Sequence, residues 1–145
     1  TRGNVGLLAR DNKDPLNLWF ISEYKKRFKA LPLGPSYQYA RSVLLYKSAM
    51  DDAKSKAGKF PTQDQVIAAM KFKKFKSFTE TISMARGNGH QSVHSVGYGL
   101  TKYNKKGKTP GAEKVKMYGP ECIYPPAGTK AEAWINAGMP GAKCN

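Results

Sequence analysis

Apolar residues recur at helical spacing near the start of the chain. Between residues 15 and 29 they lie three or four positions apart or side by side, which places them on one side of a helix. These residues are Leu16, Trp19, Phe20, Tyr24 and Phe28. Asp14 followed by Pro15 is a start signal, because an aspartate can cap free backbone N–H groups and proline fits the first helical position. The pattern predicts a helix over residues 15–29.

A second, longer helix is predicted after the break at residues 31–35, which contain two prolines and a glycine. Ser36 can cap its start, and Gly58 provides an end. The apolar stripe predicted for this helix consists of Tyr39, Val43, Tyr46, Met50 and Ala53.

The capping-box pattern predicts a third helix. Thr62 is followed three residues later by Gln65, so that each side chain can accept a hydrogen bond from a backbone N–H group in the first turn. The apolar residues Val66, Ile67 and Met70 follow. We therefore expect a short helix that starts at Thr62 and continues through Met70.

After Lys76 the spacing of apolar residues changes to every second position, which favours strands. Residues 81–84 alternate, residues 87–89 read Gly-Asn-Gly and can form a left-handed turn, and residues 93–100 form a second run. This predicts a hairpin or a looser pair of strands. Further strands are expected at residues 3–9 and 115–118.

The last part of the sequence predicts an irregular tail. Glycine and proline pairs interrupt it at residues 119–120 and 125–126. Residues 129–137 have the length of a short helix that carries Trp134 and Ile135.

Composition limits the class of protein. With 145 residues, of which 40% are hydrophobic, the chain can form one compact domain and is unlike a disordered polymer. No apolar run approaches the roughly 20 residues of a membrane-spanning helix. The first residue is Thr1 and not Met. We therefore expect a piece of a longer protein.

A net charge of +15 suggests a polyanionic partner, because basic domains bind nucleic acid through counterion release. The charge is nevertheless spread, with 12 basic and 5 acidic residues in positions 1–60 and 13 and 5 in the remainder. Two clusters stand out. Residues 71–76 interleave four lysines with two phenylalanines, as a stacking platform for single strands would, or as the end of a helix with core phenylalanines. Residues 102–108 have the composition of a basic turn between strands.

Candidate catalytic chemistry is sparse. His90 and His94 lie four apart, but the neighbouring glycines argue against the helix that would bring them to one metal, so no metal site is predicted. Cys122 and Cys144 lack the spacing of a redox or metal motif. They are either a disulfide that fixes the tail, in an exported protein, or two free thiols. No nucleophile, base and orienting group can be assembled, so we expect no enzyme and no cofactor.

The order of elements resembles the C-terminal part of the type I periplasmic solute-binding proteins of ABC importers, the group that binds branched-chain amino acids, amides and urea-like compounds. The similarity covers about 130 residues. The stretches that carry it are residues 14–17 with Phe20, Tyr24, Phe28 and Pro32, residues 39–58, residues 65–70, residues 78–84 with Gly89-His90-Gln91, and residues 121–129 with Trp134-Ile135.

The resemblance implies an α/β fold with two lobes, hinged around a cleft that binds a small solute. This chain would be the C-terminal fragment, with about three helices followed by short strands and an irregular tail. Residues 1–118 would form the segment of that fold and residues 119–145 a tail extension. Because such a fragment lacks the N-terminal portion of the protein, we expect it to expose apolar surface and to self-associate.

The function implied by the resemblance is the periplasmic substrate-binding component of an ABC transporter, which delivers an amino acid, an amide or an aromatic or carboxylate compound to a membrane permease. The family's ligand-contacting aromatic residue lies at the start of the second helix, where Tyr37 and Tyr39 are the candidates, with helix-start packing as the alternative role. If Arg41 faces the cleft, it favours an anionic solute. The competing hypothesis is a small basic nucleic-acid-binding domain that uses residues 71–76 and 102–108, and the even spread of charge makes it the weaker one.

Overall fold

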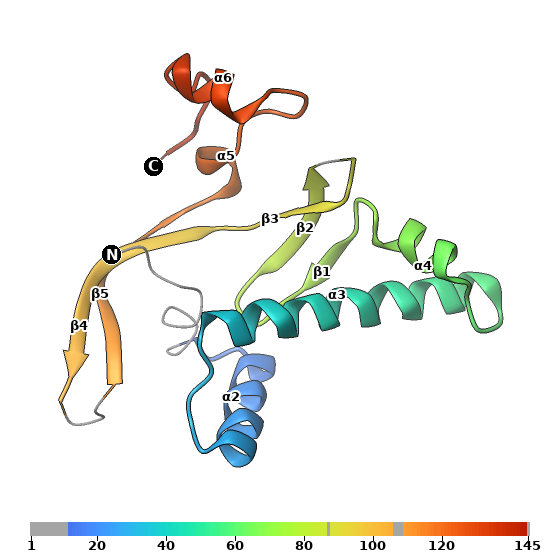
Figure 1. The fold of residues 1–145 in the computed structure, drawn as a ribbon, viewed down its shortest axis with the longest axis horizontal. Coiled ribbons are helices and arrows are strands. Elements are labelled where there is room, and N and C mark those ends of the chain that lie inside the picture. The colour runs from blue at the N-terminus through green and yellow to red at the C-terminus, as the bar shows by residue number, and fades with distance from the viewer. Residues whose placement is uncertain (1–11, 87, 106–108, 145) are drawn as a thin grey trace.

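The residues that the structure describes fold into three helices, then strands, then a short helical tail, which is the order that the sequence predicts for them (Figure 1). The computed structural model describes residues 12–86, 88–105 and 109–144. Its elements are α2 (Pro15–Phe28), α3 (Gly34–Ala57), α4 (Gln63–Met70), β1 (Lys74–Lys76), β2 (Thr81–Arg86), β3 (Gln91–Val93), β4 (Val96–Asn104), β5 (Thr109–Tyr118), α5 (Pro120–Ile123) and α6 (Ala131–Asn136). The strand expected at residues 3–9 lies outside the described residues.

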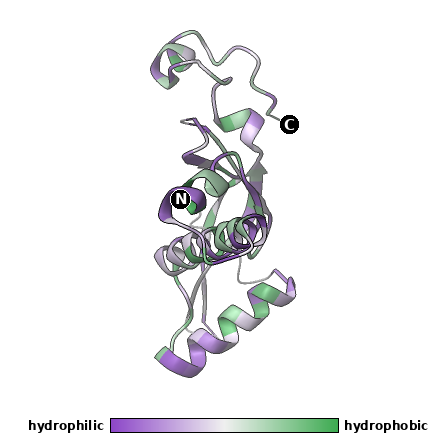
Figure 2. Cartoon of the chain, turned by 90° about the vertical axis from the view of Figure 1, so that its right-hand side faces the viewer, coloured by the Kyte–Doolittle hydropathy of each residue, from purple (hydrophilic) through white to green (hydrophobic). Residues whose placement is uncertain are grey.

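α2 begins where its capping residue predicts. The Asp14 carboxylate accepts a hydrogen bond from the Leu16 N–H group over 2.9 Å, and the helix ends at Lys29, whose φ of 54° is left-handed. Hydrophobic and hydrophilic segments alternate along this helix (Figure 2). Only part of the predicted apolar face turns inward: Leu16 and Phe20 pack on the core, whereas Trp19 and Phe28 are exposed.

α3 begins three residues earlier than predicted, and Ser36 is not its cap. Leu33 occupies the capping position and makes no side-chain hydrogen bond there. Ser36 lies inside the first turn, where its hydroxyl donates to the Tyr24 hydroxyl over 3.1 Å. The end of the helix is as predicted, because Gly58 adopts a left-handed φ of 65°.

The buried face of α3 is not the stripe that the sequence predicts. Most of the predicted stripe is exposed, with 78% of Tyr39, 66% of Val43 and 50% of Tyr46 open to solvent. The buried positions follow the same helical spacing on another side of the helix; they are Gly34, Tyr37, Arg41, Leu45, Ala49 and Ala53. Only Ala53 belongs to both sets. We call Tyr39, Val43 and Tyr46 the exposed stripe.

The capping box that opens α4 is confirmed. The Thr62 hydroxyl accepts from the Gln65 N–H group over 3.3 Å, and the Gln65 side chain accepts from the Thr62 N–H group over 2.8 Å. Two backbone N–H groups at the start of the helix are thereby satisfied without tertiary contacts. Val66 is the buried residue of this helix and packs against Ala49 and Ala53 of α3.

The strands form two antiparallel sheets. β1, β2 and β3 pair in that order, and β4 and β5 form a separate two-stranded ribbon. The turn predicted at residues 87–89 connects β2 to β3, with left-handed φ values at Asn88 and Gly89, while Gly87 lies outside the described residues. The strand predicted at residues 115–118 is part of β5.

The prediction of a single strand-like run at residues 93–100 is wrong. These residues are divided between β3 and β4, which belong to different sheets. The break falls at His94 and Ser95. The Ser95 N–H group, which would pair in a continuous strand, donates instead to the Glu80 carboxylate over 3.1 Å. Of the basic turn predicted at residues 102–108, residues 102–104 belong to the end of β4, and residues 106–108 lie outside the described part.

The core lies between α3 and the three-stranded sheet, with α2 on the other side of the first turns of α3 (Figure 1). One cluster joins Leu45 to Phe75, Ile82 and Met84 of the sheet. A second joins Tyr37 to Phe78. The fold is thus a mixed helix-and-strand arrangement in which every strand pairing of the described residues is antiparallel.

Residues 119–144 form the tail, which contains the predicted short helix as α6. Cys122 and Cys144, for which the sequence left two states open, are joined by a disulfide with a Cα–Cα distance of 4.8 Å. Trp134 of α6 is 4% exposed, and its indole N–H donates to Pro140 O over 3.0 Å. Among the described helices, none combines the length and apolar character that crossing a membrane requires.

Candidate functional site

Tyr37, the first of the two candidate ligand-contacting residues, is buried completely. Its hydroxyl donates to Asn17 Oδ1 over 2.9 Å. Its ring packs edge-on against Phe20 and Phe78, at centroid distances of 5.0 and 5.4 Å. Because the ring has no exposed surface, these contacts fit the packing role that the sequence offered as the alternative.

Tyr39, the second candidate, lies on the opposite side of α3, where 78% of it is exposed. It stands at the beginning of the exposed stripe. Of the two tyrosines, only Tyr39 presents a ring to a molecule outside the core. Ligand binding by one of these two tyrosines stays a prediction. Because Tyr37 is buried, Tyr39 is the better candidate of the two.

Arg41 lies one helical turn after Tyr37 on the buried face of α3, and only 8% of it is exposed. Its Nε is buried and has no hydrogen-bond partner among the described residues. Burial lowers the pKa of the guanidinium below its usual value, while the charges of Glu80 and Tyr124 act in the opposite direction.

The turn at residues 77–80 carries a second buried polar atom without a partner. Ser77 is 1% exposed, its N–H group donates to Glu80 O over 2.9 Å, and its hydroxyl meets no hydrogen-bond partner among the described residues. The Glu80 carboxylate is held by the Ser95 N–H group. Because Phe78 packs against Tyr37, this turn lies on the first turns of α3. We call Arg41, Ser77 and Glu80 the Arg41 cluster.

The tail is fixed to the C-terminal end of β2. The Arg86 guanidinium donates to the Pro125 carbonyl and, over 3.4 Å, to the Pro126 carbonyl. The same guanidinium lies 6.0 Å from the centroid of the Tyr124 ring. Tyr124 is also near enough to affect the pKa of Arg41. Arg86 therefore links the end of β2 to the tail.

A small cleft lies beside the disulfide. It has a volume of about 150 Å³ and is lined by Met117, Tyr118, Gly119, Glu121, Cys122, Lys143 and Cys144. Ligand pockets usually hold 300 to 1,000 Å³. This cleft is therefore too small to enclose an organic solute by itself.

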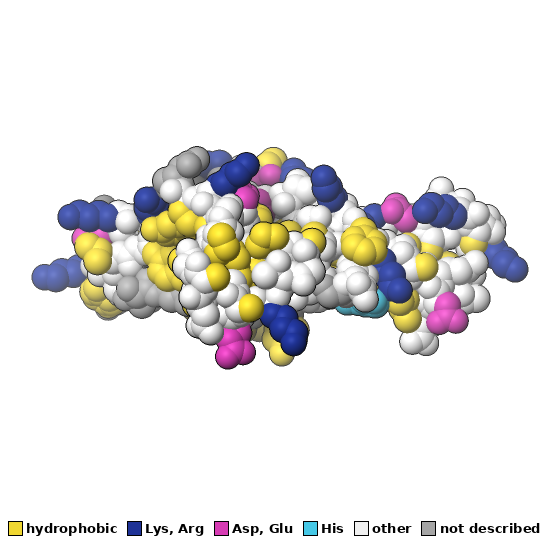
Figure 3. Space-filling model, turned by 90° about the horizontal axis from the view of Figure 1, so that it is seen from above, with side chains coloured by type: hydrophobic (Ala, Val, Ile, Leu, Met, Phe, Trp, Pro, Cys, Tyr) yellow, Lys and Arg dark blue, Asp and Glu magenta, His cyan; other side chains and the backbone are white. Residues whose placement is uncertain are grey.

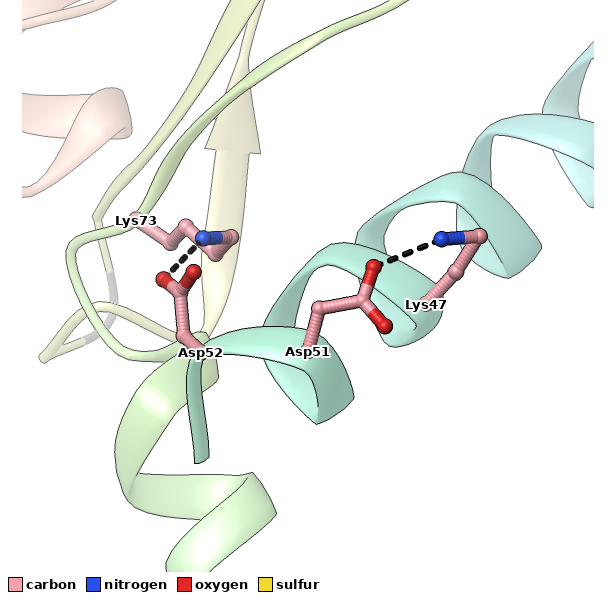
Figure 4. A network of polar contacts seen from close by, with 4 residues as sticks. All are labelled: Lys47, Asp51, Asp52 and Lys73. Atoms are coloured by element: carbon pink, nitrogen blue, oxygen red, sulfur yellow. Dashed lines mark hydrogen bonds and ion pairs between the residues drawn. The ribbon is translucent and has the colours of Figure 1, made fainter. Parts of the chain in front are cut away.

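In the described part of the chain, some members of the two basic clusters are engaged within the protein, whereas Phe72 is 63% exposed. At residues 71–76, Phe75 is buried and Lys73 lies 2.5 Å from Asp52, next to a second ion pair between Lys47 and Asp51 at 2.6 Å (Figure 4). Lys76 pairs with Asp14 at 3.1 Å, and Lys102 of the second cluster pairs with Glu113 at 2.7 Å. Seen from above, lysine and arginine side chains are spread along the molecule (Figure 3).

Metal chemistry finds no support in the described residues, which contain no group of three or more metal-ligating side chains. His90 is exposed, and His94 Nδ1 lies 3.0 Å from Ser95 O. The absence of a metal site stays a prediction for the chain as a whole.

Sequence reasoning named Arg41 as a possible cleft residue but predicted neither its burial nor that of Ser77. The signal was present in the spacing of residues 37, 41, 45 and 49, which the structure shows to be the buried face. The sequence alone could not choose it, because the exposed stripe has the same spacing and a more apolar composition.

Comparison with known proteins supports the fold. No protein-family model matches the sequence, and no curated protein matches it. The structure is similar to part of an ABC-type branched-chain amino acid transporter from Rhodopseudomonas palustris, with a TM-score of 0.62 and 23% sequence identity. The similarity covers 78% of this chain and 29% of that one. At this level of identity, the comparison shows a shared fold.

Proposed function

We propose that the chain is the C-terminal part of the solute-binding component of an ABC importer, and that the whole protein binds an amino acid, an amide or a carboxylate compound. The observation that carries this proposal is the similarity of fold to the Rhodopseudomonas palustris transporter, which extends over 78% of the chain. The order of helices, hairpin and proline-containing tail agrees with the family that the sequence resembles.

The exposed stripe of α3 supports a larger protein around this chain. Tyr39, Val43 and Tyr46 lie three or four residues apart on one side of a 24-residue helix, opposite the face that packs on the sheet. A helix that is apolar on two sides is normally buried on both. In the similar structure the matched part is 29% of the chain. We propose that an N-terminal portion of the same protein covers the stripe, and that the chain without it self-associates there.

Tyr39 is the residue that we propose to contact the solute. It stands in the first turns of α3, beyond which the described chain offers no covering segment, and its ring is 78% exposed. Aromatic rings combine a large apolar surface with a hydroxyl that can donate to a polar solute. Tyr37, with its hydroxyl bonded to Asn17, supports the helix start from below.

Location and partners follow from the same proposal. A binding protein of this class works outside the cytoplasmic membrane and delivers its solute to a permease, without catalysis. The disulfide between Cys122 and Cys144 agrees with an oxidising compartment such as the periplasm.

The proposal is tested by thermal unfolding of the full-length protein that contains this chain, with a panel of branched-chain amino acids, their amides and aromatic carboxylates. We expect at least one member to raise the unfolding temperature in a concentration-dependent way. Tyr39→Ala should lower the affinity for that solute about tenfold or more, as the loss of an aromatic contact at the centre of a binding site commonly does. Tyr103→Ala, at a tyrosine of the β4–β5 ribbon that is 61% exposed, is the matched control and should leave binding unchanged.

Binding of nucleic acid in place of a solute would contradict the proposal. If no solute in the panel binds, and the protein instead binds DNA or RNA with an affinity that falls steeply between two salt concentrations, the proposal is wrong and the basic-domain hypothesis replaces it.

A further inference from the structure

The two cysteines of the tail disulfide differ in exposure. Cys122 belongs to α5 and is 6% exposed, whereas Cys144 near the end of the chain is exposed. A thiolate breaks a disulfide by attacking one of its two sulfur atoms, and access decides which of the two is attacked. The arrangement therefore favours attack at Cys144, with Cys122 as the sulfur that leaves.

The small cleft beside the disulfide provides a route for the attacking group. Both cysteines line it, so that the bond is reached from the cleft without unfolding of the tail. Its volume is about 150 Å³. One water molecule needs roughly 10–15 Å³ of the same measure. The cleft therefore admits a sulfur atom with its neighbouring CH₂ group, while the rest of a small thiol stays in solvent.

Two side chains of opposite charge line the same cleft, Glu121 and Lys143. A Cβ atom added at Gly119 would stand 2.5 Å from Glu121 Oε1, so the carboxylate lies against the Gly119 wall of the cleft. A thiolate that enters carries a negative charge, which Lys143 attracts and Glu121 repels. The two effects oppose each other, and the cleft does not exclude the anion.

The end of the chain is also held near α5 by contacts other than the disulfide. The Lys143 N–H group donates to Glu121 O over 3.1 Å, and the Trp134 indole donates to Pro140 O over 3.0 Å. These bonds do not depend on the S–S bond. When the disulfide opens, they keep the released thiol of Cys122 close to its former partner, so the bond can form again.

We propose that Cys144 is a site of reversible modification by low-molecular-weight thiols, such as cysteine or glutathione, which reach it through the cleft. The thiolate forms a bond to Cys144 Sγ, the bond to Cys122 Sγ breaks, and Cys122 Sγ leaves with the electron pair and takes a proton from water. One disulfide replaces another, so no further oxidant or reductant is needed. Attack of the Cys122 thiolate on Cys144 Sγ reverses the step and releases the small thiol. This inference does not depend on the proposed function.

The test uses the native full-length protein with reduced glutathione, stopped with acid after a series of short times. Cleavage after glutamate at acidic pH separates the two cysteines, because Glu121 and Glu132 flank residues 122–132 and place Cys144 in the next peptide. Mass spectrometry of the peptides locates the glutathione. At the shortest times we expect about ten times more glutathione on Cys144 than on Cys122, and a rate that rises in proportion to the glutathione concentration.

The unfolded protein is the first control. In urea, where both sulfur atoms are accessible, glutathione should attack the two cysteines at similar rates. Charge variants of the cleft are the second control, with the rate followed by the mass of the intact protein. Lys143→Met should slow the attack about threefold at low salt, and Glu121→Gln should speed it by a similar factor. Lys130→Met, at an exposed lysine of the tail that does not line the cleft, should react like the unaltered protein.

Several results would overturn the inference. Glutathione that appears first or equally on Cys122, or in the same ratio as in urea, would show that the fold does not direct the attack to Cys144. A rate that stops rising with glutathione concentration, or no reaction before unfolding, would mean that the tail must open first. Rates unaffected by both Lys143→Met and Glu121→Gln would exclude the cleft as the route. The measurements on the unaltered protein decide the site of attack even if a tail variant fails to fold.

Discussion

The Tyr37 hydroxyl donates a hydrogen bond to Asn17 Oδ1 over 2.9 Å, and neither residue has any exposed surface. The bond joins α2 to the first turns of α3. Asn17 extends it, because its Nδ2 donates to Asn12 O over 2.9 Å. A polar contact of this kind fixes how the two helices meet, since any other arrangement would leave a buried amide or hydroxyl without its partner.

Removing the Tyr37 hydroxyl should therefore cost stability. We expect Tyr37→Phe to lower the free energy of unfolding by about 1–3 kcal/mol, the usual cost when a buried polar group loses its partner. Urea unfolding at pH 7 measures it. Tyr39→Phe removes a hydroxyl from a residue that is 78% exposed and should change the same quantity by less than about 0.5 kcal/mol. Equal effects of the two substitutions would contradict the role assigned to the bond.

Local signals were predicted well from the sequence. The Asp14 cap, the capping box at Thr62 and Gln65, and the left-handed turn at Asn88 and Gly89 depend on backbone chemistry within a few residues. Tertiary contact has little influence on whether such side chains can satisfy neighbouring N–H groups.

The buried face of α3 could not be predicted in the same way. The helix has apolar residues on two sides, and the period of the pattern is identical for both. Burial was decided by Phe75, Phe78 and Ile82, which come from strands and a turn far along the chain. For the same reason the sequence could not predict the Arg41 cluster, because its members come from α3 and from the 77–80 turn, which pack together only in the folded chain.

Asp14 should make stability depend on pH. The Leu16 N–H group, which bonds its carboxylate, and then Lys76, which pairs with it, lower the pKa of Asp14 from the usual 3.8. The folded state therefore binds this proton less readily than the unfolded state, so its contribution is present above pH 4 and is lost as the pH falls through the lowered pKa. Asp14→Asn keeps a capping oxygen and removes the charge.

We expect Asp14→Asn to unfold at a lower urea concentration than the unaltered chain at pH 7, and the difference between the two proteins to be smaller near pH 3. In a Lys76→Met background the difference at pH 7 should be smaller, because one of the two partners of the carboxylate is gone. A difference that does not change between the two pH values would show that the Asp14 charge has no part in stability.

The disulfide should hold the tail together. Cys122 and Cys144 are 22 residues apart, and closing a loop of this size contributes about 3 kcal/mol in the chain-entropy description. Reduction should expose Trp134, which is 4% exposed, and shift its fluorescence to longer wavelength, with faster tryptic cleavage at the exposed Lys130. Trp19 is already 58% exposed and adds little to the change.

The matched control is the double variant Cys122→Ser with Cys144→Ser. It should show the shifted fluorescence without reductant and should not respond to reductant. If reduction leaves the emission and the cleavage rate of the unaltered chain unchanged, the bonds of Arg86 to the tail and of Trp134 to Pro140 are sufficient, and the disulfide is dispensable for the tail.

Replacing Gly89 or Gly58 with alanine should strain the backbone at both positions, but only at Gly89 should it also cause a steric clash. Both have a left-handed backbone, with φ values of 84° and 65°, so an added Cβ strains either position. At Gly58 nothing lies within 4 Å of the added atom, whereas at Gly89 it would stand 2.7 Å from the Phe72 backbone nitrogen. We expect Gly58→Ala to cost about 1 kcal/mol of unfolding free energy in urea titrations. Gly89→Ala should cost clearly more, because the backbone at Phe72 must also move and Phe72 is itself held at a φ of 54°. Similar costs at the two positions would mean that the β2–β3 turn is not packed against residue 72 as the structure has it.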